Sequence, residues 1–188
     1  MTHLGTVRLE TDRLILRRFV ETDIEDVFNN WCNDPEVTKY LTWPTHSDVS
    51  VTRGFMTTRL EGYAKENFYS WAMELKETKQ VIGTIAAVGQ REDVQSVEIG
   101  YAMGRAWWNR GYMSEALGAV VKFFFEEAGM NRVEAHHDPR NPGSGRVMQK
   151  AGLIYEGTLR QADTNNQGVC DKACYAILAS DYDKGESL

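Results

Sequence analysis

The chain has 188 residues, of which 42% are hydrophobic, and its formal net charge is −6 at pH 7. This length fits one sizeable hydrophobic core and leaves little room for a second independent domain, so we expect a single domain over residues 1–188. The net charge argues against a nucleic-acid-binding protein, which needs a basic face, and it mildly favours cationic substrates.

Other features of the composition indicate a soluble, cytoplasmic protein that is not a membrane protein. No apolar run reaches the roughly 20 residues that cross a bilayer, and the first residues lack the basic and apolar segments of a secretory signal. The three cysteines, Cys32, Cys170 and Cys174, are an odd number in a chain long enough to fold without disulfides. We therefore expect reduced thiols.

The first third of the chain predicts a strand and two helices. Residues 13–19 alternate between polar and apolar side chains, which is typical of a strand. Apolar residues from Ile24 to Trp31 recur at helical spacing, and an Asp-Pro pair ends that helix. A second helix is predicted from about Asp48 to Lys65, with Ser47 or Asp48 as its N-cap.

After this region the pattern changes to the two-residue period of strands. Residues 69–75, 80–88 and 96–103 each predict a short strand, and the polar segments between them suit hairpin turns. Three successive strands predict an antiparallel meander.

The rest of the chain alternates helices with strands. Apolar residues after Gly111 lie on one wide helical face, and Gly129 closes that helix. A strand, a short helix and two final strands are then predicted over residues 131–137, 144–150, 153–160 and 169–178. The resulting order is β-α-α-β-β-β-α-β-α-β-β.

The most informative segment joins the strand over residues 96–103 to the helix after Gly111. A turn with a glycine at its tightest point leaves backbone N–H groups free at the start of a helix. Those donors suit an anion such as a pyrophosphate. Taken alone, the glycine is equally consistent with an ordinary strand-to-helix connection.

The order of elements and two motifs resemble the GCN5-related N-acetyltransferase (GNAT) family, and within it the branch that acetylates the N-terminal amines of ribosomal proteins. The first motif comprises residues 98–101 (Glu-Ile-Gly-Tyr) and 108–116 (Trp-Asn-Arg-Gly-Tyr-Met-Ser-Glu-Ala), and the second is residues 141–153. The resemblance extends from Thr11 to Tyr182. It implies one α/β (α+β) domain with a mixed, mostly antiparallel sheet of about seven strands flanked by four helices.

In this family the first motif forms the loop that binds the pyrophosphate of acetyl-CoA. The resemblance places Gly111 at the glycine of that loop, with Asn109 in place of a frequent glycine and Met113 in place of glycine or alanine. Asparagine tolerates positive φ, whereas the Met113 side chain would crowd the phosphates unless it turns into the core. The cofactor-binding residues implied here are Tyr101, Ala102, Met103, Trp108, Asn109, Arg110, Gly111, Tyr112, Met113 and Ser114.

The second motif resembles the segment beside the pantetheine arm of acetyl-CoA. Asn141 carries both a donor and an acceptor, which suit the pantetheine amides at a place where two strands part. A turn beside Pro142 is the alternative role for Asn141. Ser144 would contact the cofactor, cap the following helix, or do both, because serine at a helix start is commonly an N-cap.

Acetyl transfer needs a base, because a primary amine is mostly protonated at neutral pH. The resemblance places Glu98 at a position where family members carry that base and face the acceptor. Partial burial among apolar neighbours would raise the pKa of Glu98 toward neutrality. An ion pair with Arg105 or Arg110 is the alternative role for this glutamate.

The remaining roles are implied by the family. A backbone N–H at residues 102–104, where the family has a bulge, would stabilise the oxyanion. Many relatives use a tyrosine seven residues after the asparagine to protonate the thiolate, but this chain has Met148 there, which leaves Ser144 as the candidate acid. Trp43, in the loop between the first two helices, would form a wall of the acceptor site.

No metal cofactor is expected. His136 and His137 are adjacent on a predicted strand and therefore point to opposite faces. Cys170 and Cys174 lack further ligands nearby and would make a poor zinc site.

Together these features predict an N-acetyltransferase that moves acetyl from acetyl-CoA to a primary amine by direct attack in a ternary complex. Its partners would be acetyl-CoA and an amine acceptor, such as the N-terminal amine of a ribosomal protein, and the chain would be a monomer or a homodimer. Two alternatives stay open. The acceptor could be a small amine such as an antibiotic or a polyamine, or the chain could be a non-catalytic acyl-CoA-binding sensor or scaffold.

Overall fold

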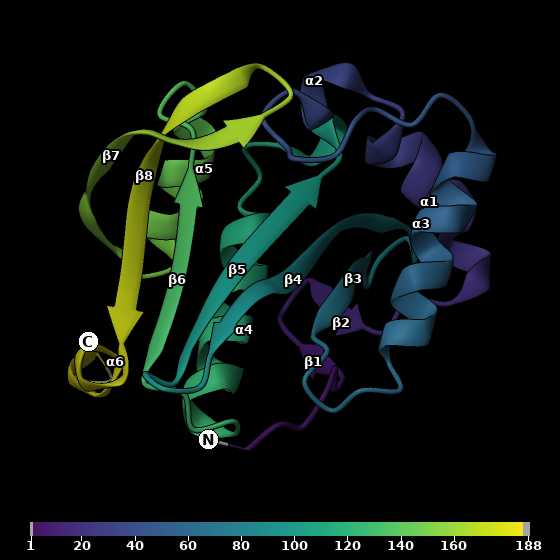
Figure 1. Ribbon diagram of the computed structural model, residues 1–188. Helices are drawn as coiled ribbons and strands as arrows, with labels where there is room; N and C mark the ends of the chain where they lie inside the picture. Colours follow the sequence, from purple (N-terminus) through teal and green to yellow (C-terminus); the bar gives the residue numbers. More distant parts are fainter. Residues whose placement is uncertain (1, 186–188) are drawn as a thin grey trace.

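The computed structural model describes residues 2–185, which form one mixed β-sheet with helices on both faces (Figure 1). Within these residues eight strands lie in the order β1-β2-β3-β4-β5-β6-β8-β7, and only β5 and β6 pair in parallel. The strands are β1 Leu9–Glu10, β2 Leu14–Arg17, β3 Ser70–Leu75, β4 Val81–Arg91, β5 Ser96–Met103, β6 Arg132–His137, β7 Ile154–Asn165 and β8 Gly168–Leu178. The seven predicted strands are confirmed. The additional strand, β1, is too short to show a period.

Helices occupy the four predicted helical segments and two others. They are α1 Ile24–Val27, α2 Pro35–Thr38, α3 Val49–Gly62, α4 Tyr112–Glu126, α5 Pro142–Lys150 and α6 Ala179–Gly185. The first predicted helix is a composite of α1 with a 3-10 turn (η1, Glu21–Asp23) and a π-helical turn (η2, Phe28–Cys32). The sequence does not predict α2 and α6, which are too short for a clear apolar face. None of the helices in residues 2–185 is long and apolar enough to cross a membrane.

Local chemistry sets the ends of the longer helices as predicted. The Asp48 carboxylate accepts a hydrogen bond from the Ser50 N–H at 2.8 Å and caps α3. Gly129 follows α4 with a φ of 66°, a conformation that glycine adopts without a Cβ clash.

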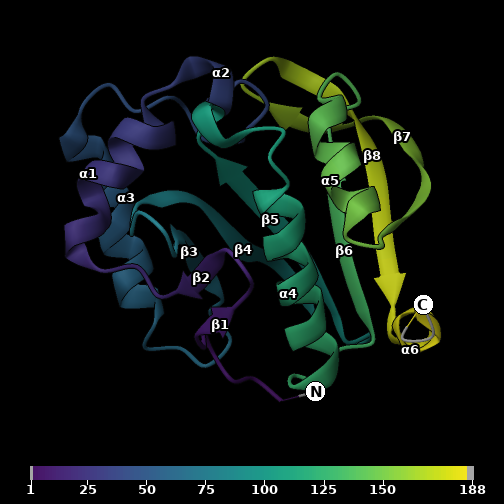
Figure 2. The same cartoon turned by 180° about the vertical axis from the view of Figure 1, so that it is seen from behind.

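The helices cover both faces of the sheet, which gives the molecule three layers (Figures 1 and 2). On one face α4 and α5 pack into a large apolar core that includes Phe124 and Met148. On the other face α1, η2 and α3 pack into a smaller core around Trp31 and Met56. β5 contributes Val97, Ile99 and Met103 to the large core and Ala102 to the smaller one, so this strand borders both layers.

The sheet divides between β5 and β6. Their pairing covers only residues 96–98 of β5 and 132–134 of β6. β5 continues to Met103 and β6 continues to His137 beyond the last paired residues. Residues 99–103 therefore border an opening in the sheet, where unpaired backbone groups are available to a ligand.

The last hairpin reaches across to the first half of the chain. Both β7 and β8 are longer than predicted, and the turn between them lies beside the loop that follows α2 (Figure 1). The Asn166 N–H donates to the Leu41 carbonyl at 3.1 Å. Its side-chain amide donates to the carbonyls of Thr38 and Trp43 at 2.8 and 2.7 Å. These bonds tie the hairpin tip to the loop before α3.

Candidate active site

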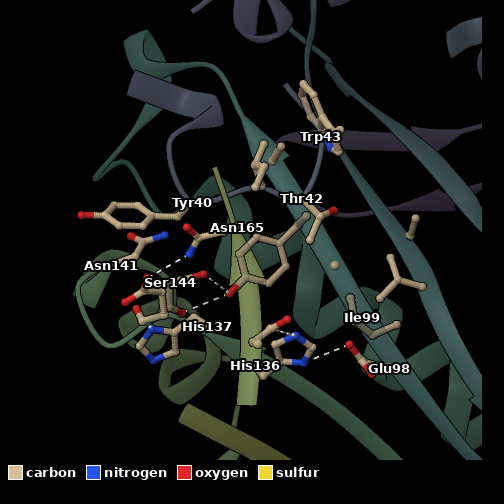
Figure 3. A pocket seen from close by; sticks show the side chains of 18 of the residues that line it. Tyr40, Thr42, Trp43, Glu98, Ile99, His136, His137, Asn141, Ser144 and Asn165 are labelled. Atoms are coloured by element: carbon tan, nitrogen blue, oxygen red, sulfur yellow. Dashed lines mark hydrogen bonds and ion pairs between the residues drawn. The ribbon is translucent and has the colours of Figure 1, made fainter. Parts of the chain in front are cut away.

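Two cavities lie on either side of the opening between β5 and β6. The first, which we call the α5 cavity, has a volume of about 410 Å³ and is lined by residues of α2, β5, α5 and the start of α4. The second, the hairpin cavity, has a volume of about 530 Å³ and is lined by residues of α3, β4, β5, β6 and the β7–β8 hairpin (Figure 3). Both cavities share six lining residues, Tyr40, Leu41, Tyr101, Ala102, Asn141 and Ser144. The two spaces therefore adjoin at these residues.

The predicted anion-binding turn forms one wall of the α5 cavity. Gly111 is the N-cap of α4 with a φ of 82°, and Asn109 has a φ of 61°. Within the described residues no side chain caps this helix end. Gly111 and Ser114 line the cavity, so the first-turn N–H groups and the positive end of the helix dipole are available to an anion there.

The remaining residues of this loop support it. The Met113 side chain is 3% exposed and packs in the large core, although Met113 also contributes to the lining of the α5 cavity. The Arg13 guanidinium donates to the Arg110 carbonyl at 2.9 Å and lies over the Tyr112 ring, 4.3 Å from its centroid. It also pairs with the Glu115 carboxylate at 2.6 Å. Arg110 and Tyr112 are absent from the lining of either cavity and brace the loop against Arg13.

At the other wall of the α5 cavity, α5 begins at Pro142 with Asn141 as its N-cap. Ser144 therefore lies inside the first turn, and its predicted capping role is wrong. Its hydroxyl donates to the Tyr101 hydroxyl at 3.0 Å, which donates to the Ser144 carbonyl at 3.0 Å. Burial raises the pKa of Tyr101, so this phenol stays neutral. The Asn141 side chain makes no capping hydrogen bond and lines both cavities.

Two backbone N–H groups of β5 point into the opening. The Gly104 N–H donates to the Ile82 carbonyl of β4 at 2.9 Å. In an antiparallel pair, every second residue of a strand points its N–H toward the same neighbouring strand. The N–H of Ala102 therefore also points to β4, while those of Tyr101 and Met103 point away from it. The predicted donor range, residues 102–104, thus contains one N–H that points away from β4, that of Met103, and Tyr101 adds a second. The register shift that was expected there lies on β4, between residues 87 and 89.

A row of three ionisable side chains lines the hairpin cavity (Figure 3). The Nδ1 of His136 lies 2.9 Å from the Glu98 carboxylate, and its Nε2 lies 3.0 Å from the Asp163 carboxylate. An imidazole donates from both nitrogens only when it is protonated. The imidazolium form therefore satisfies both carboxylates at once.

The surroundings of Glu98 differ from both expectations. The hydrogen bond from His136 lowers the pKa of Glu98 and outweighs the opposing effect of burial, so the expected upward shift is wrong. The expected arginine partner is wrong as well, because Arg105 pairs with Asp34 at 3.0 Å. Since His136 follows Glu98 by 38 positions on a different strand, sequence spacing gives no signal of this contact.

Three other singled-out residues of this region lie in the loop before α3 and on β6. Trp43 lines the hairpin cavity and packs on Phe55, with 5.7 Å between ring centroids. His136 and His137 both line this cavity but have different partners, and the Nδ1 of His137 lies 2.8 Å from the Asp138 carbonyl. In the part of the chain that the structure describes, no three His, Cys, Asp or Glu side chains are grouped to hold a metal ion.

Comparison with known proteins decides the family. The family model described as "Acetyltransferase (GNAT) domain" matches residues 13–154. The chain belongs to the GNAT acetyltransferase family. The uncharacterized N-acetyltransferase YoaA of Bacillus subtilis (strain 168) is 33% identical over 170 residues, which cover 90% of this chain and 96% of YoaA. This GNAT protein is accordingly an enzyme, an N-acetyltransferase.

More distant GNAT relatives include proteins with named acceptors. The ribosomal-protein-serine acetyltransferase of Escherichia coli (strain K12) is 27% identical and covers 89% of this chain and 94% of its own length. A solved GNAT acetyltransferase from Bacillus anthracis has a TM-score of 0.82 at 27% identity and covers 93% of this chain and 99% of its own. RimL, a ribosomal L7/L12 acetyltransferase solved with coenzyme A, also has a TM-score of 0.82, at 17% identity and 93% and 99% coverage.

In this GNAT domain the sequence motifs miss several lining residues. The α5 cavity carries three basic side chains, Lys39, Arg146 and Lys150, that suit phosphate groups. Arg146 and Lys150 are four residues apart and so lie on one face of α5, a spacing visible in the sequence. Lys39 and the acidic and basic residues of the hairpin cavity have no such signal, because they come from separate elements.

Proposed function

We propose that this GNAT domain transfers the acetyl group of acetyl-CoA to a primary amine by direct attack, with both substrates bound at once. Acetyl-CoA would occupy the α5 cavity and the amine acceptor the hairpin cavity. The observation that carries this proposal is the junction at Tyr101, Ala102, Asn141 and Ser144, where a ligand in one cavity meets a ligand in the other.

Several features of the α5 cavity support the cofactor assignment. The uncapped start of α4 offers N–H donors to the pyrophosphate, and the three lysine and arginine side chains add positive charge for the phosphates. Asn141 stands at the opening between β5 and β6, where its amide can bond the pantetheine arm. The thioester end would then lie at the junction.

The chemical step needs a proton acceptor and a new carbon–nitrogen bond. The amine nitrogen attacks the thioester carbonyl carbon after losing its ammonium proton, and the carbon–sulfur bond then breaks to release the CoA thiolate. Glu98 is ionised at neutral pH and can accept that proton, while the hydrogen bond from His136 lowers its pKa and makes it a weaker base. Four residues of strand, about 13 Å, separate Glu98 from Ala102, so the proton would reach Glu98 through water.

Backbone and side-chain donors at the junction support the other two roles. The N–H of Tyr101 or Met103 points into the opening and would stabilise the developing oxyanion. The Ser144 hydroxyl already donates its proton to Tyr101, which favours it as an acceptor for a pantetheine N–H. The thiolate would then take its proton from water, and Ser144 would act in positioning.

For the acceptor we propose the N-terminal amine of a protein, such as a ribosomal protein. The named activity of the Escherichia coli relative supports this choice, as do the cavity carboxylates Glu98 and Asp163, which favour a cationic amine. A small amine is the second candidate, because the hairpin tip is tied across to the loop before α3 and narrows the entrance for a large substrate.

A screen of acceptors, monitored by release of the CoA thiol, tests this function. Peptides beginning with serine or alanine, polyamines and amino compounds would be compared at equal concentration. We expect release of thiol with at least one class and a mass increase of one acetyl group on its amine. If every amine leaves acetyl-CoA intact while CoA still binds, the sensor or scaffold alternative replaces the enzyme proposal.

A further inference from the structure

The hairpin cavity contains two buried polar groups without partners in residues 2–185, one from α3 and one from β4. Both Arg59 and Thr84 line this cavity. Arg59 Nε and Thr84 Oγ1 are buried and have no hydrogen-bond partner within residues 2–185. The described residues also provide no ion pair for the Arg59 guanidinium, whose close contact is the Phe55 ring, 3.6 Å from Cζ to the centroid. Leaving such groups unpaired is costly, so their presence indicates a ligand.

The charge on Arg59 is not neutralised by its ionisable neighbours. Those neighbours are Tyr63 and Cys32, together with His46, which carries no negative charge in either protonation state. Burial raises the pKa of Cys32 to about 12 and also raises the pKa of Tyr63, so both are uncharged at neutral pH. Burial lowers the pKa of Arg59 to about 10, which leaves the guanidinium positive at neutral pH. The wall of the hairpin cavity thus carries a cation without a counterion.

Thr84 lies close to the place where acetyl transfer would occur, and Arg59 lines the same cavity. Thr84 on β4 is the register partner of Ala102 on β5, and Ala102 lines both cavities. Neighbouring strands are about 4.8 Å apart, and register partners point to the same face of a sheet. Thr84 is therefore one strand away from the junction, on the acceptor side.

We propose that Arg59 and Thr84 form a subsite for a carboxylate that the amine acceptor carries close to the nitrogen to be acetylated. This inference rests on the function proposed above and specifies its substrate class. The planar guanidinium can donate hydrogen bonds to both oxygens of a carboxylate. Stacking on the Phe55 ring fixes the orientation of the guanidinium plane and leaves the N–H groups at its edge free to donate. The Thr84 hydroxyl supplies a further donor.

The rest of the cavity favours a carboxylate over a phosphate. Glu98 and Asp163 line the same space and would repel a group with two negative charges more strongly than a group with one. The same two carboxylates attract the ammonium of the acceptor. A molecule with an amine and a carboxylate near each other matches both signs of charge.

Two kinds of acceptor present this chemistry, and matched pairs of compounds distinguish them. A small amino-carboxylate is represented by β-alanine, with β-alaninamide as its uncharged partner. A peptide N-terminus with an acidic side chain is represented by Ser-Asp-Ala-amide, with Ser-Asn-Ala-amide as its partner. The quantity measured is kcat/KM from CoA thiol release, expressed as the carboxylate-to-carboxamide ratio within each pair.

We expect wild-type protein to prefer the carboxylate by at least about tenfold in one of the two pairs, since hydrogen bonds between charged groups are strong. Arg59→Gln should bring that ratio near one, Arg59→Lys should give an intermediate ratio, and Thr84→Val should lower it partly. Arg53→Gln, at an exposed arginine on the same helix, should keep the wild-type ratio. The pair that shows the preference identifies the source of the carboxylate.

Equal use of carboxylate and carboxamide by the wild type would overturn the subsite, and so would an equal loss of both in Arg59→Gln. Calorimetric titration of β-alanine and Ser-Asp-Ala-amide into CoA-saturated protein gives an answer that does not need turnover. Binding by wild type that Arg59→Gln or Arg59→Lys weakens supports the subsite even where the proposed enzyme function fails. Binding that the variants leave unchanged refutes it even where acetyl transfer is intact.

Discussion

The two cavities are built in different ways. The α5 cavity is lined largely by three continuous segments, residues 101–103, 108–114 and 141–150, and its central feature is the backbone of a helix start. The hairpin cavity is lined by side chains from α3, α5, five strands and the loops between them. Backbone recognition constrains a short stretch of sequence, because the turn needs particular φ angles. Side-chain recognition constrains only which residues meet in space, so acceptor sites of one fold can differ freely.

Disrupting the helix start should have the largest effect. Gly111 has a φ of 82°, and a Cβ there would lie 3.4 Å from the Arg13 guanidinium. Gly111→Trp should therefore weaken CoA binding by about 100-fold, through strain and blocked N–H donors. Isothermal titration with CoA measures this. Gly118→Ala, at a glycine of α4 with open space around it, is the control. Unchanged affinity in Gly111→Trp would place the cofactor elsewhere.

Removal of the proton acceptor should affect turnover without affecting cofactor binding. Glu98→Gln keeps the shape of the side chain but cannot accept the ammonium proton, so kcat/KM should fall by about 100-fold while CoA affinity stays the same. Glu134→Gln, at the register partner of Glu98 on β6 and outside the hairpin cavity lining, is the matched control. If Glu98→Gln lost both CoA binding and activity, Glu98 would maintain the structure of the opening between β5 and β6 and would not act as the proton acceptor.

Release of the hairpin tip should disturb acceptor binding alone. Asn166→Ala removes two side-chain hydrogen bonds, to Thr38 and Trp43, that hold the wall of the hairpin cavity. We expect KM for the acceptor to rise about fivefold, with CoA affinity unchanged. The neighbouring exposed residue offers Gln167→Ala as the control. Equal shifts in CoA and acceptor binding would show that the two cavities do not behave separately.

The smallest expected effect is a change in pH dependence. His136 lowers the pKa of Glu98, so His136→Gln should raise that pKa and move the acidic limb of the kcat/KM profile to higher pH. Because the pKa of Glu98 is lower in the folded wild type than its ordinary value of 4.5, ionised Glu98 stabilises the folded state at pH values above 4.5. This contribution to the free energy of unfolding is lost as the pH falls through the lower folded-state pKa. His3→Gln, outside both cavities, controls for a general histidine effect. If the acidic limb of the profile does not move in His136→Gln, ionisation of Glu98 does not cause the observed pH dependence.

Much of the fold was predictable because its signals are local. Asp48 caps α3 through a bond to a residue two positions away, and the strand over residues 96–103 has the predicted bounds. The Ser144 error has a local cause too. Proline is favoured in the first turn of a helix, so Pro142 marks the start of α5 and leaves Ser144 inside it.

Errors and omissions at the site concern contacts between distant residues. Burial of Glu98 alone predicts a raised pKa, and only the approach of His136 from β6 reverses its sign. Arg59 is, in the sequence, one more polar residue of an amphipathic helix. Its lack of a counterion becomes visible only when the neighbouring elements are in place.

By itself the sequence determined the order of elements, the family resemblance and the turn at Gly111 with Asn109 beside it. Each of these depends on the backbone preferences of residues that are close together in the chain. The tertiary structure decided the partners of Glu98, the N–H groups that face the opening, and the presence of both Arg59 and Thr84 in the lining of the hairpin cavity. Those features depend on strand register and on charges that meet across the sheet, and neither is encoded in local spacing.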